Sequence, residues 1–323
     1  MTRRIALSSC PLCDETAAVP WLTARGFRLV RCAACGHRYA TERLPPDELA
    51  DRYYGEAAAD LRARASSEKA ARLDEYDALL RRLDPESGGL CARGSDGAVR
   101  RVLDVGCNTG ELLALLKARG FAVAGVELGA GAAEVAEQRL GVPIAPSLEV
   151  LPDEPRFDLI TLTHVLEHVA DPRALLRSLR RRLRPGGRLL VEVPCADDPL
   201  LGLFGGAYRP LCPGDHVSFF DADGLRRVLR AAGCTVRGLS APTHARDLVY
   251  PVLLSSLDSL RALRPRRAGG AGVGAQVRYR GRLRRPLRRL LDGACALLDP
   301  LVVRLAARRS AALRGSVLIA IAS

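Results

Sequence analysis

The sequence predicts an α/β protein with a doubly wound, mainly parallel sheet of seven strands. A small cysteine-containing module precedes the sheet, and a basic helical insertion lies near the C-terminal end. From residue 99 onward, apolar strand-like runs alternate with helix-like stretches, as in a parallel sheet with helices on both faces. The 323 residues suffice for one large core and a small attachment.

Changes in composition divide the chain into five expected segments. They are a cysteine module over 1–45, a helical linker over 46–98, the sheet domain over 99–246, the basic insertion over 247–314 and a final strand over 315–323. In the linker, apolar residues recur at helical spacing and predict one buried helix face. These residues are Leu73, Tyr76, Leu80 and Leu83.

Local signals predict the elements of the sheet domain. The expected strands cover 101–105, 121–126, a short stretch near 142, 157–163, 188–193, 235–239 and 316–322. Helices are expected over 111–119 and 132–140, and two more begin at Asp171 and Asp221. Asp171 is followed by Pro172, the usual order of an N-cap and a first helical residue, and Pro185 is expected to end that helix.

Four cysteines near the N-terminus form two pairs. Cys10 and Cys13 are one C-x2-C pair, Cys32 and Cys35 are the other, and 18 residues separate the pairs. This spacing allows two turns to present four thiolates to a tetrahedral zinc ion. Such a site has no open coordination position, so we expect a structural role; His37 is an alternative ligand.

The junction between the first strand of the sheet and its helix predicts a ligand site. Gly106 and Gly110 allow a sharp turn and a close backbone approach because they lack a Cβ. Glu127 ends the next strand, 21 residues after Gly106. A carboxylate at this place can hold the hydroxyls of a ribose. We therefore expect a nucleoside ligand.

The motif D-x-G-x-N-x-G over 104–110 differs from the G-x-G-x-x-G of dinucleotide-binding folds. It resembles the first motif of class I S-adenosylmethionine-dependent methyltransferases, and Glu127 resembles their second. The resemblance implies a donor site in which Asp104 helps to hold the amino-acid tail, directly or through water. Where many relatives have an Asp for adenine, this chain has Ser147-Leu148-Glu149. The expected donor-binding residues are Asp104, Gly106, Cys107, Asn108, Gly110, Glu127, Leu128, Leu148 and His164.

The segment His164-Val-Leu-Glu167-His168 follows the fourth strand. It matches the H-x-x-E-H pattern of one metalloprotease group, but that group carries the pattern within a long helix. The segment also resembles the fourth motif of small-molecule methyltransferases, including the ubiquinone-pathway type. That resemblance implies that His164 lies near the donor and that Glu167 and His168 lie near the acceptor. A divalent-ion site and a local turn cap are alternatives.

His216 lies in a long loop after the fifth strand, four residues before Phe220. The segment resembles the H-x-x-x-F of bacterial methyltransferases that carry an N-terminal CxxC pair. A histidine has a pKa suited to accepting a proton from a hydroxyl. The expected catalytic residues are therefore His216, His168 and Glu167, with a packing or gating role as the alternative for His216.

The positive charge of the chain is concentrated near its C-terminal end. Residues 261–314 contain 15 Arg, no Lys and two Asp, and this excess of +13 equals the net charge of the whole chain. The leucines among the arginines favour two interpretations of this segment: it binds an anionic membrane surface through 278–309, or it forms a cap over the substrate. Binding to nucleic-acid phosphates is less favoured. Because no window of about 18 residues lacks charge, we expect a cytoplasmic protein, or one peripheral to the inner face of the membrane.

The expected reaction is methyl transfer from S-adenosylmethionine to a hydroxyl, less so an amine or a carbon, of a small-molecule or glycan-like acceptor. The alternative is a zinc-containing protein that binds or modifies RNA through the basic segment. The first 45 residues have balanced charge and few aromatic residues for base stacking, which disfavours that alternative. A catalytically inactive scaffold is a third possibility.

Overall fold

The computed structural model describes residues 4–45, 48–49, 70, 72–83, 85, 89–94, 96–152, 154, 156–243, 249, 252, 294–295, 298 and 317–323. The chain forms two compact units. The sheet unit comprises Pro45–Val193, Ala222–Ser240 and Ile319–Ser323, and the cysteine unit comprises Met1–Leu44, Pro194–Asp221 and Ala241–Leu318. The predicted basic insertion over 247–314, with its membrane surface over 278–309, lies almost entirely outside the described residues.

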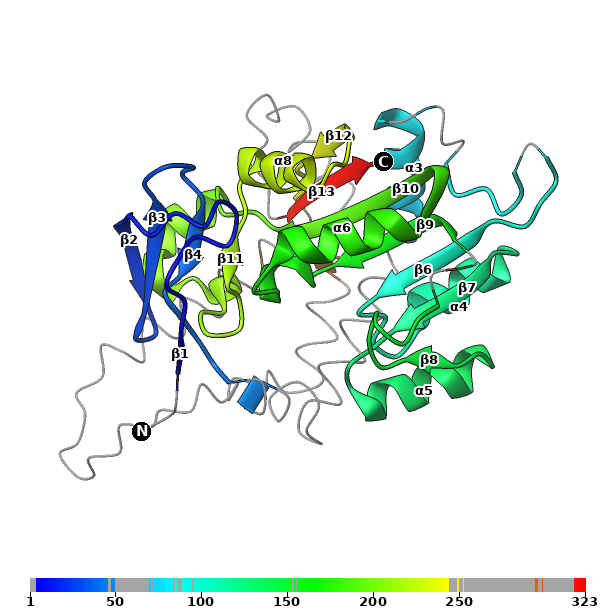
Figure 1. The fold of residues 1–323 in the computed structure, drawn as a ribbon, viewed down its shortest axis with the longest axis horizontal. Coiled ribbons are helices and arrows are strands. Elements are labelled where there is room, and N and C mark those ends of the chain that lie inside the picture. Colours follow the sequence, from blue (N-terminus) through cyan, green and yellow to red (C-terminus); the bar gives the residue numbers. More distant parts are fainter. Residues whose placement is uncertain are drawn as a thin grey trace. The chain divides into compact units, whose positions relative to one another are not determined.

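The sheet unit contains the predicted seven-stranded sheet, in the order β12-β13-β10-β9-β6-β7-β8 (Figure 1). The strands are β6 (Arg101–Val105), β7 (Ala122–Val126), β8 (Ile144–Ala145), β9 (Phe157–Thr163), β10 (Leu183–Pro194), β12 (Val236–Ser240) and β13 (Val317–Ala322). The five strands from β10 to β8 pair in parallel, whereas β12 and β13 pair antiparallel. The predicted, mainly parallel sheet of seven strands is therefore confirmed, including the predicted final strand.

Helices connect these strands where the sequence predicts them. They are α3 (Leu73–Leu83), α4 (Glu111–Ala118), α5 (Ala130–Leu140), α6 (Pro172–Arg182) and α8 (Ala222–Ala231). Asp171 caps α6 as predicted, because its carboxylate accepts the backbone N–H of Ala174 at 2.9 Å. The end of α6 differs from the prediction. The helix stops at Arg182, and the chain enters β10 at Leu183, before the proline and glycines that were expected to end it.

Apolar side chains from the central strands form the core of the sheet unit. Val102, Leu103, Ile160 and Leu190 are fully buried. The apolar face of α3 joins this core, since Leu73, Tyr76 and Leu80 are buried as predicted; the side chain of Leu83 lies outside the described part. A continuous apolar run is what a strand buried on both faces requires, and this core fixes the edge of the sheet where the candidate ligand residues lie.

The cysteine unit has a four-stranded antiparallel sheet in the order β11-β4-β3-β2. Its strands are β2 (Ala18–Ala24), β3 (Phe27–Cys32), β4 (Arg38–Ala40) and β11 (Ser218–Phe219), and a small pair joins β1 (Ile5–Ala6) to β5 (Glu42–Arg43). Strand β11 comes from the loop after β10, far along the chain, and pairs with β4. Sequence analysis placed this loop, residues 194–221, with the sheet domain; in the structure it forms one compact unit with the N-terminal strands.

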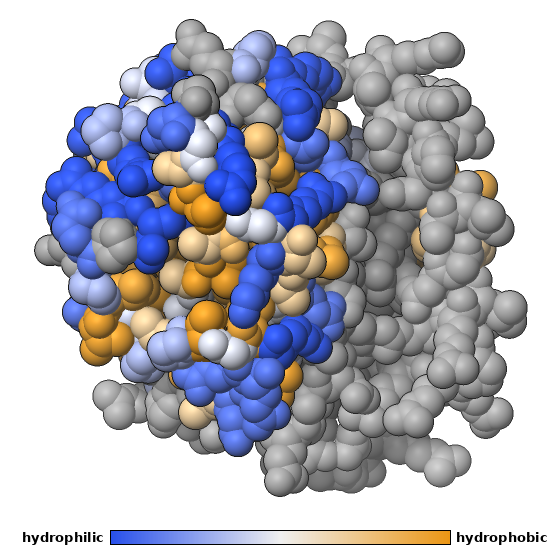
Figure 2. Space-filling view, turned by 90° about the vertical axis from the view of Figure 1, so that its right-hand side faces the viewer, coloured by the Kyte–Doolittle hydropathy of each residue, from blue (hydrophilic) through white to orange (hydrophobic). Residues whose placement is uncertain are grey.

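The loop from 194 to 221 also contains α7 (Pro199–Phe204) and two single 3₁₀ turns, η4 (Gly205–Ala207) and η5 (Arg209–Leu211). Among the described residues, no helix is long and apolar enough to cross a membrane. On the face shown in Figure 2, apolar residues lie in patches between hydrophilic ones.

Candidate functional site

The carboxyl ends of β6, β7 and β9 lie side by side because these strands are parallel neighbours. The chain leaves β6 in a tight turn in which Gly106, Asn108 and Gly110 all have left-handed backbone angles, with φ of 70°, 53° and 75°. The backbone N–H groups of Gly106 and Cys107 donate to the carbonyl of Val126 at 2.8 and 3.0 Å. The turn is therefore fixed against the end of β7.

The packing around the turn explains its glycines. A Cβ at Gly106 would lie 2.6 Å from Cγ2 of Val165, and a Cβ at Gly110 would lie 3.0 Å from the Cβ of Ala136. Both positions also have the positive φ that favours glycine. The turn thus packs directly against the H-x-x-E-H segment, which contains Val165, and against α5.

Glu127 lies at the end of β7 with its carboxylate held by the backbone. Its Oε2 accepts the N–H of Asn108 at 2.8 Å, and its Oε1 accepts the N–H of Gly129 at 2.9 Å. Each carboxylate oxygen has a second lone pair, so the group can still accept hydrogen bonds from a ligand. Leu128 is 71% exposed beside it, whereas Leu148 is buried.

Asp104 is fully buried in β6, below the edge of the sheet. Its Oδ1 accepts the hydroxyl of Thr161 on the neighbouring strand β9 at 2.6 Å. The described contact of Asp104 is therefore internal, and it joins the two strands that carry the turn and the H-x-x-E-H segment.

The H-x-x-E-H segment leaves β9 and forms the single 3₁₀ turn η3 (Leu166–His168). The segment does not lie within a long helix, whereas the metalloprotease group carries the same pattern within one. His164 has a left-handed backbone, with φ of 52°. Its Nδ1 lies 3.4 Å from Glu167 Oε1, and its Nε2 lies 3.0 Å from Glu192 Oε1. Desolvation lowers the pKa of His164, but hydrogen bonds to the two carboxylates outweigh it and raise the pKa to about 10.

Sequence analysis missed Glu192, which is completely buried near the end of β10. Arg72 Nη1 donates to its Oε1 at 2.7 Å, and the hydroxyl of Tyr76 donates to its Oε2 at 3.0 Å. Burial raises the pKa of Glu192, but the charge of Arg72 and the bond from His164 outweigh it and lower the pKa to about 2. The available signal was a carboxylate within the apolar run Leu-Leu-Val-Glu-Val, because a charge in a central strand needs partners.

The predicted catalytic residues fall in two different units. Glu167 is buried in the sheet unit, and its Oε1 lies 3.8 Å from Nε2 of the partly exposed His168. His216 belongs to the cysteine unit, where it is 8% exposed and its ring centroid lies 6.3 Å from that of Phe219. His216 lines a small cavity there together with Cys195, Leu201 and other residues of the same loop.

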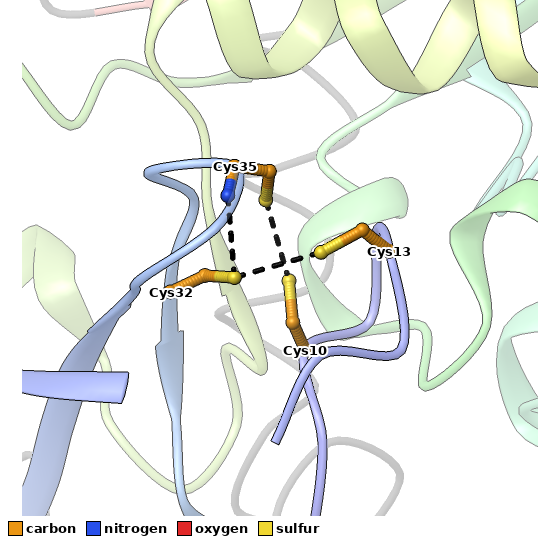
Figure 3. Close-up of side chains that lie close together, drawn as sticks. All are labelled: Cys10, Cys13, Cys32 and Cys35. Atoms are coloured by element: carbon orange, nitrogen blue, oxygen red, sulfur yellow. Dashed lines mark hydrogen bonds between the residues drawn. The ribbon is translucent and has the colours of Figure 1, made fainter. Parts of the chain in front are cut away.

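The four predicted zinc ligands come together in the cysteine unit. Figure 3 shows the side chains of Cys10, Cys13, Cys32 and Cys35 pointing toward one another. The Sγ atoms of Cys10 and Cys35 are 3.6 Å apart, those of Cys13 and Cys32 are 3.5 Å apart, and all four lie within 4.8 Å of one another.

This arrangement fits a tetrahedral metal site. Four sulfurs at about 2.3 Å from one zinc ion are about 3.8 Å from each other, close to the spacing observed. The N–H of Cys35 points to Cys32 Sγ at 3.5 Å, as in a turn built around a thiolate. Burial raises the pKa of the Cys10 thiol, so a bound cation would be needed to keep it deprotonated at neutral pH.

A family model described as a methyltransferase domain matches residues 51–239, which is more than half of the chain. The chain belongs to this family. The ubiquinone biosynthesis O-methyltransferase of Aeromonas salmonicida is 30% identical over 176 residues, which cover 50% of this chain and 70% of that protein. Its counterpart from Alkalilimnicola ehrlichii is 31% identical over 168 residues, which cover 48% and 67%.

The solved structures to which this chain is similar include a SAM-dependent methyltransferase from Archaeoglobus fulgidus. It is 18% identical, covers 85% of this chain and 98% of its own, and has a TM-score of 0.43. The predicted enzyme class is confirmed: the chain is a methyltransferase. The glycine turn and Glu127 lie within the matched residues, whereas the cysteine cluster precedes them.

Proposed function

We propose that this methyltransferase transfers a methyl group to a hydroxyl of a small-molecule or glycan-like acceptor. The observation that carries the proposal is the tight turn over 106–110 next to the fixed carboxylate of Glu127. The choice of a hydroxyl is supported by the relatives, which are named O-methyltransferases. Transfer to an amine or a carbon is the less favoured outcome.

The described residues suit a donor with an adenosine and an amino-acid tail. Glu127 would accept hydrogen bonds from the ribose hydroxyls, and the exposed Leu128 would pack on the adenine, which removes its apolar surface from water. The turn, with Gly106, Cys107, Asn108 and Gly110, would line the middle of the donor, with Leu148 and His164 at its margins. Asp104, which accepts a hydrogen bond from Thr161, would help to hold the amino-acid tail from beneath the turn, directly or through water. S-adenosylmethionine supplies a methyl group already activated on a sulfonium.

Catalysis then depends mainly on alignment and on removal of one proton. Alignment of an acceptor oxygen with a methyl carbon supplies most of the rate through proximity. We propose His216 as the base that accepts the hydroxyl proton. Glu167 and His168 stay the predicted catalytic residues of the sheet unit. The small cavity beside His216 is lined largely by apolar groups.

We also propose that the four-cysteine cluster binds one structural zinc ion per chain through Cys10, Cys13, Cys32 and Cys35. Elemental analysis of the purified protein should give a stoichiometry near one. An intact protein that lacks metal and has four reactive thiols would contradict this proposal. The RNA-binding alternative and the membrane surface depend on arginines outside the described residues and stay predictions.

The donor site is tested by calorimetric titration with S-adenosylhomocysteine. Replacement of Glu127 by Ala removes a charged hydrogen-bond acceptor, for which about 1.5–3 kcal/mol is typical. We expect the dissociation constant to rise about tenfold to a hundredfold. Glu134→Ala, on the exposed surface of α5 in the same unit, is the matched control and should bind normally. Equal binding by both variants would overturn the assignment of Glu127.

The reaction is tested by incubating the protein with S-adenosylmethionine and a panel of phenolic, sugar and amine acceptors. Mass spectrometry should detect methylation of a hydroxyl-bearing acceptor. In such an assay, His216→Ala should lower kcat by about a hundredfold or more and leave S-adenosylhomocysteine affinity unchanged. An unchanged kcat in His216→Ala would show that His216 is not the base.

A further inference from the structure

The loop that carries His216 is built onto the N-terminal cysteine module. The antiparallel pair of β11 and β4 joins Ser218 to Tyr39 and Phe219 to Arg38. The N–H of Ala40 donates to the carbonyl of Val217 at 2.9 Å, and that of Leu44 donates to Gly214 at 3.0 Å. Backbone hydrogen bonds on both sides of His216 therefore go to residues 38–44.

Side chains add to this attachment. The rings of Trp21 and Phe219 meet edge to face with centroids 5.7 Å apart, and those of His37 and Phe220 lie 5.1 Å apart. Arg38 donates to Asp197 at 2.7 Å and to the carbonyl of Ala196 at 3.1 Å. Both ends of the loop are thus held by residues on or next to β4, and by Trp21 on β2.

The packing is close enough that even a methyl group would disturb it. A Cβ at Gly206 would lie 2.2 Å from the backbone oxygen of Thr23, and a Cβ at Gly214 would lie 2.6 Å from Cζ of Phe27. Contacts below 3.0 Å to backbone atoms force the backbone to move. The loop therefore fits one arrangement of the N-terminal strands.

The cysteine cluster lies at the turn that leads into β4. Cys32 is the last residue of β3, and its N–H donates to the carbonyl of His37 at 2.8 Å, which closes the turn that leads into β4. Cys35 lies within this turn, so two of the four cluster residues border the start of the strand that pairs with β11. A zinc ion in the cluster would fix this turn to the segment that carries Cys10 and Cys13.

We propose that the four-cysteine zinc site is the positioning element of the acceptor loop: zinc binding holds β4 in place and thereby holds residues 194–221 and His216. This inference rests on the proposed function for the zinc ion and for the acceptor, whereas the attachment of the loop to β4 is observed in the structure. The donor-binding turn and Glu127 belong to the other unit. Loss of zinc should therefore impair acceptor use and leave donor binding intact.

The fluorescence of Trp21 can report whether β11 is paired with β4. Trp21 is the single tryptophan of the chain, it is half-buried, and it contacts Phe219 of β11. Its emission should shift to the red when β11 leaves β4. Hydrogen exchange at the amides of residues 217–220 gives a second, independent measure.

The first experiment removes zinc from the whole chain of 323 residues with a chelator and then restores it. We expect a red shift of Trp21 emission and at least tenfold faster exchange at residues 217–220, both reversed by added zinc. The dissociation constant for S-adenosylhomocysteine should change less than twofold. Unchanged protection of residues 217–220 in zinc-free protein would overturn the proposal, and so would a parallel loss of donor affinity. Zinc-loaded protein that does not bind S-adenosylhomocysteine at all would instead contradict the proposed function.

A second experiment detaches the loop without touching the cysteines. Gly206→Ala places a methyl group against the backbone of Thr23, whereas Gly202→Ala, in α7 of the same loop, meets nothing within 4 Å. Both variants should retain zinc and bind S-adenosylhomocysteine normally. Gly206→Ala alone should show faster exchange at 217–220 and a raised KM for whichever acceptor the panel identifies. Native-like exchange in Gly206→Ala would show that the loop does not depend on this attachment.

Discussion

The two units differ in what holds them together. The sheet unit is built on parallel strands whose apolar side chains are buried on both faces, so its order comes from a hydrophobic core. The cysteine unit has a smaller, four-stranded sheet and gathers four thiols within 4.8 Å. Small folds of this kind generally depend on a metal or on disulfides for stability. In the proposed function, donor binding belongs to the unit that packing stabilises, and the loop with His216 belongs to the unit that a zinc ion would stabilise.

The largest effect that would test this contrast is loss of a zinc ligand. Cys32→Ser should abolish zinc binding and disorder the cysteine unit, because structural zinc contributes on the order of 10 kcal/mol of binding free energy. Circular dichroism with thermal melting should show the transition of the sheet unit retained. Cys234→Ser, at a buried cysteine of the sheet unit outside the cluster, is the control and should keep its zinc. A zinc content in Cys32→Ser equal to that of the unchanged protein would contradict this contrast between the two units.

The second test concerns the buried charges of the sheet unit, which are the exception to its apolar core. Glu192→Gln leaves Arg72 without its negative partner, and breaking a buried ion pair from one side typically costs about 3–5 kcal/mol. Urea unfolding should show this loss of free energy of unfolding. The same change at the exposed Glu134 should have almost no effect. If both variants unfold at the same urea concentration, the network around Glu192 does not stabilise the unit.

The third test compares two glycines that share a positive φ. Gly106 and Gly141 have φ of 70° and 61°, but a Cβ at Gly141 would meet nothing within 4 Å. Gly141→Ala should cost about 1 kcal/mol from backbone strain alone. Gly106→Ala should cost more, about 2–3 kcal/mol, because its Cβ also meets Val165, and its affinity for S-adenosylhomocysteine should fall. Equal stability and equal affinity in the two variants would show that the turn is not a packed ligand cradle.

The smallest expected effect is a pH dependence that arises from His164. Its folded pKa of about 10 lies above the ordinary 6.5, so its pairing with Glu167 and Glu192 stabilises the folded state fully below pH 6.5. That stabilisation is lost as the pH rises toward 10. The destabilisation caused by His164→Asn should therefore be larger at pH 6.5 than at pH 10, as measured by urea unfolding. A constant difference between the two pH values would mean that the imidazole is not charged in the folded protein.

The sequence predicted the fold well where local signals and packing agree. The order of strands and helices, the cap at Asp171 and the cysteine cluster all depend on patterns within short segments. It did not predict that β11 would pair with β4, because a two-residue strand has no periodicity and its partner lies about 180 positions away. It also did not predict the network around Glu192, since Arg72, just before α3, and Tyr76, within α3, lie 120 and 116 residues earlier in the chain.

One consequence of strand order concerns how the protein is made. In the sheet, β12 is hydrogen-bonded to β13 on its inner side, and β13 lies between β12 and β10. The segment 236–240 therefore leaves the ribosome long before residues 317–322, which it needs as a neighbour. At synthesis rates of about 5–20 residues per second, the nascent chain spends several seconds with one margin of its sheet incomplete. During that interval, the edge of β10 that β13 later covers lacks its neighbouring strand.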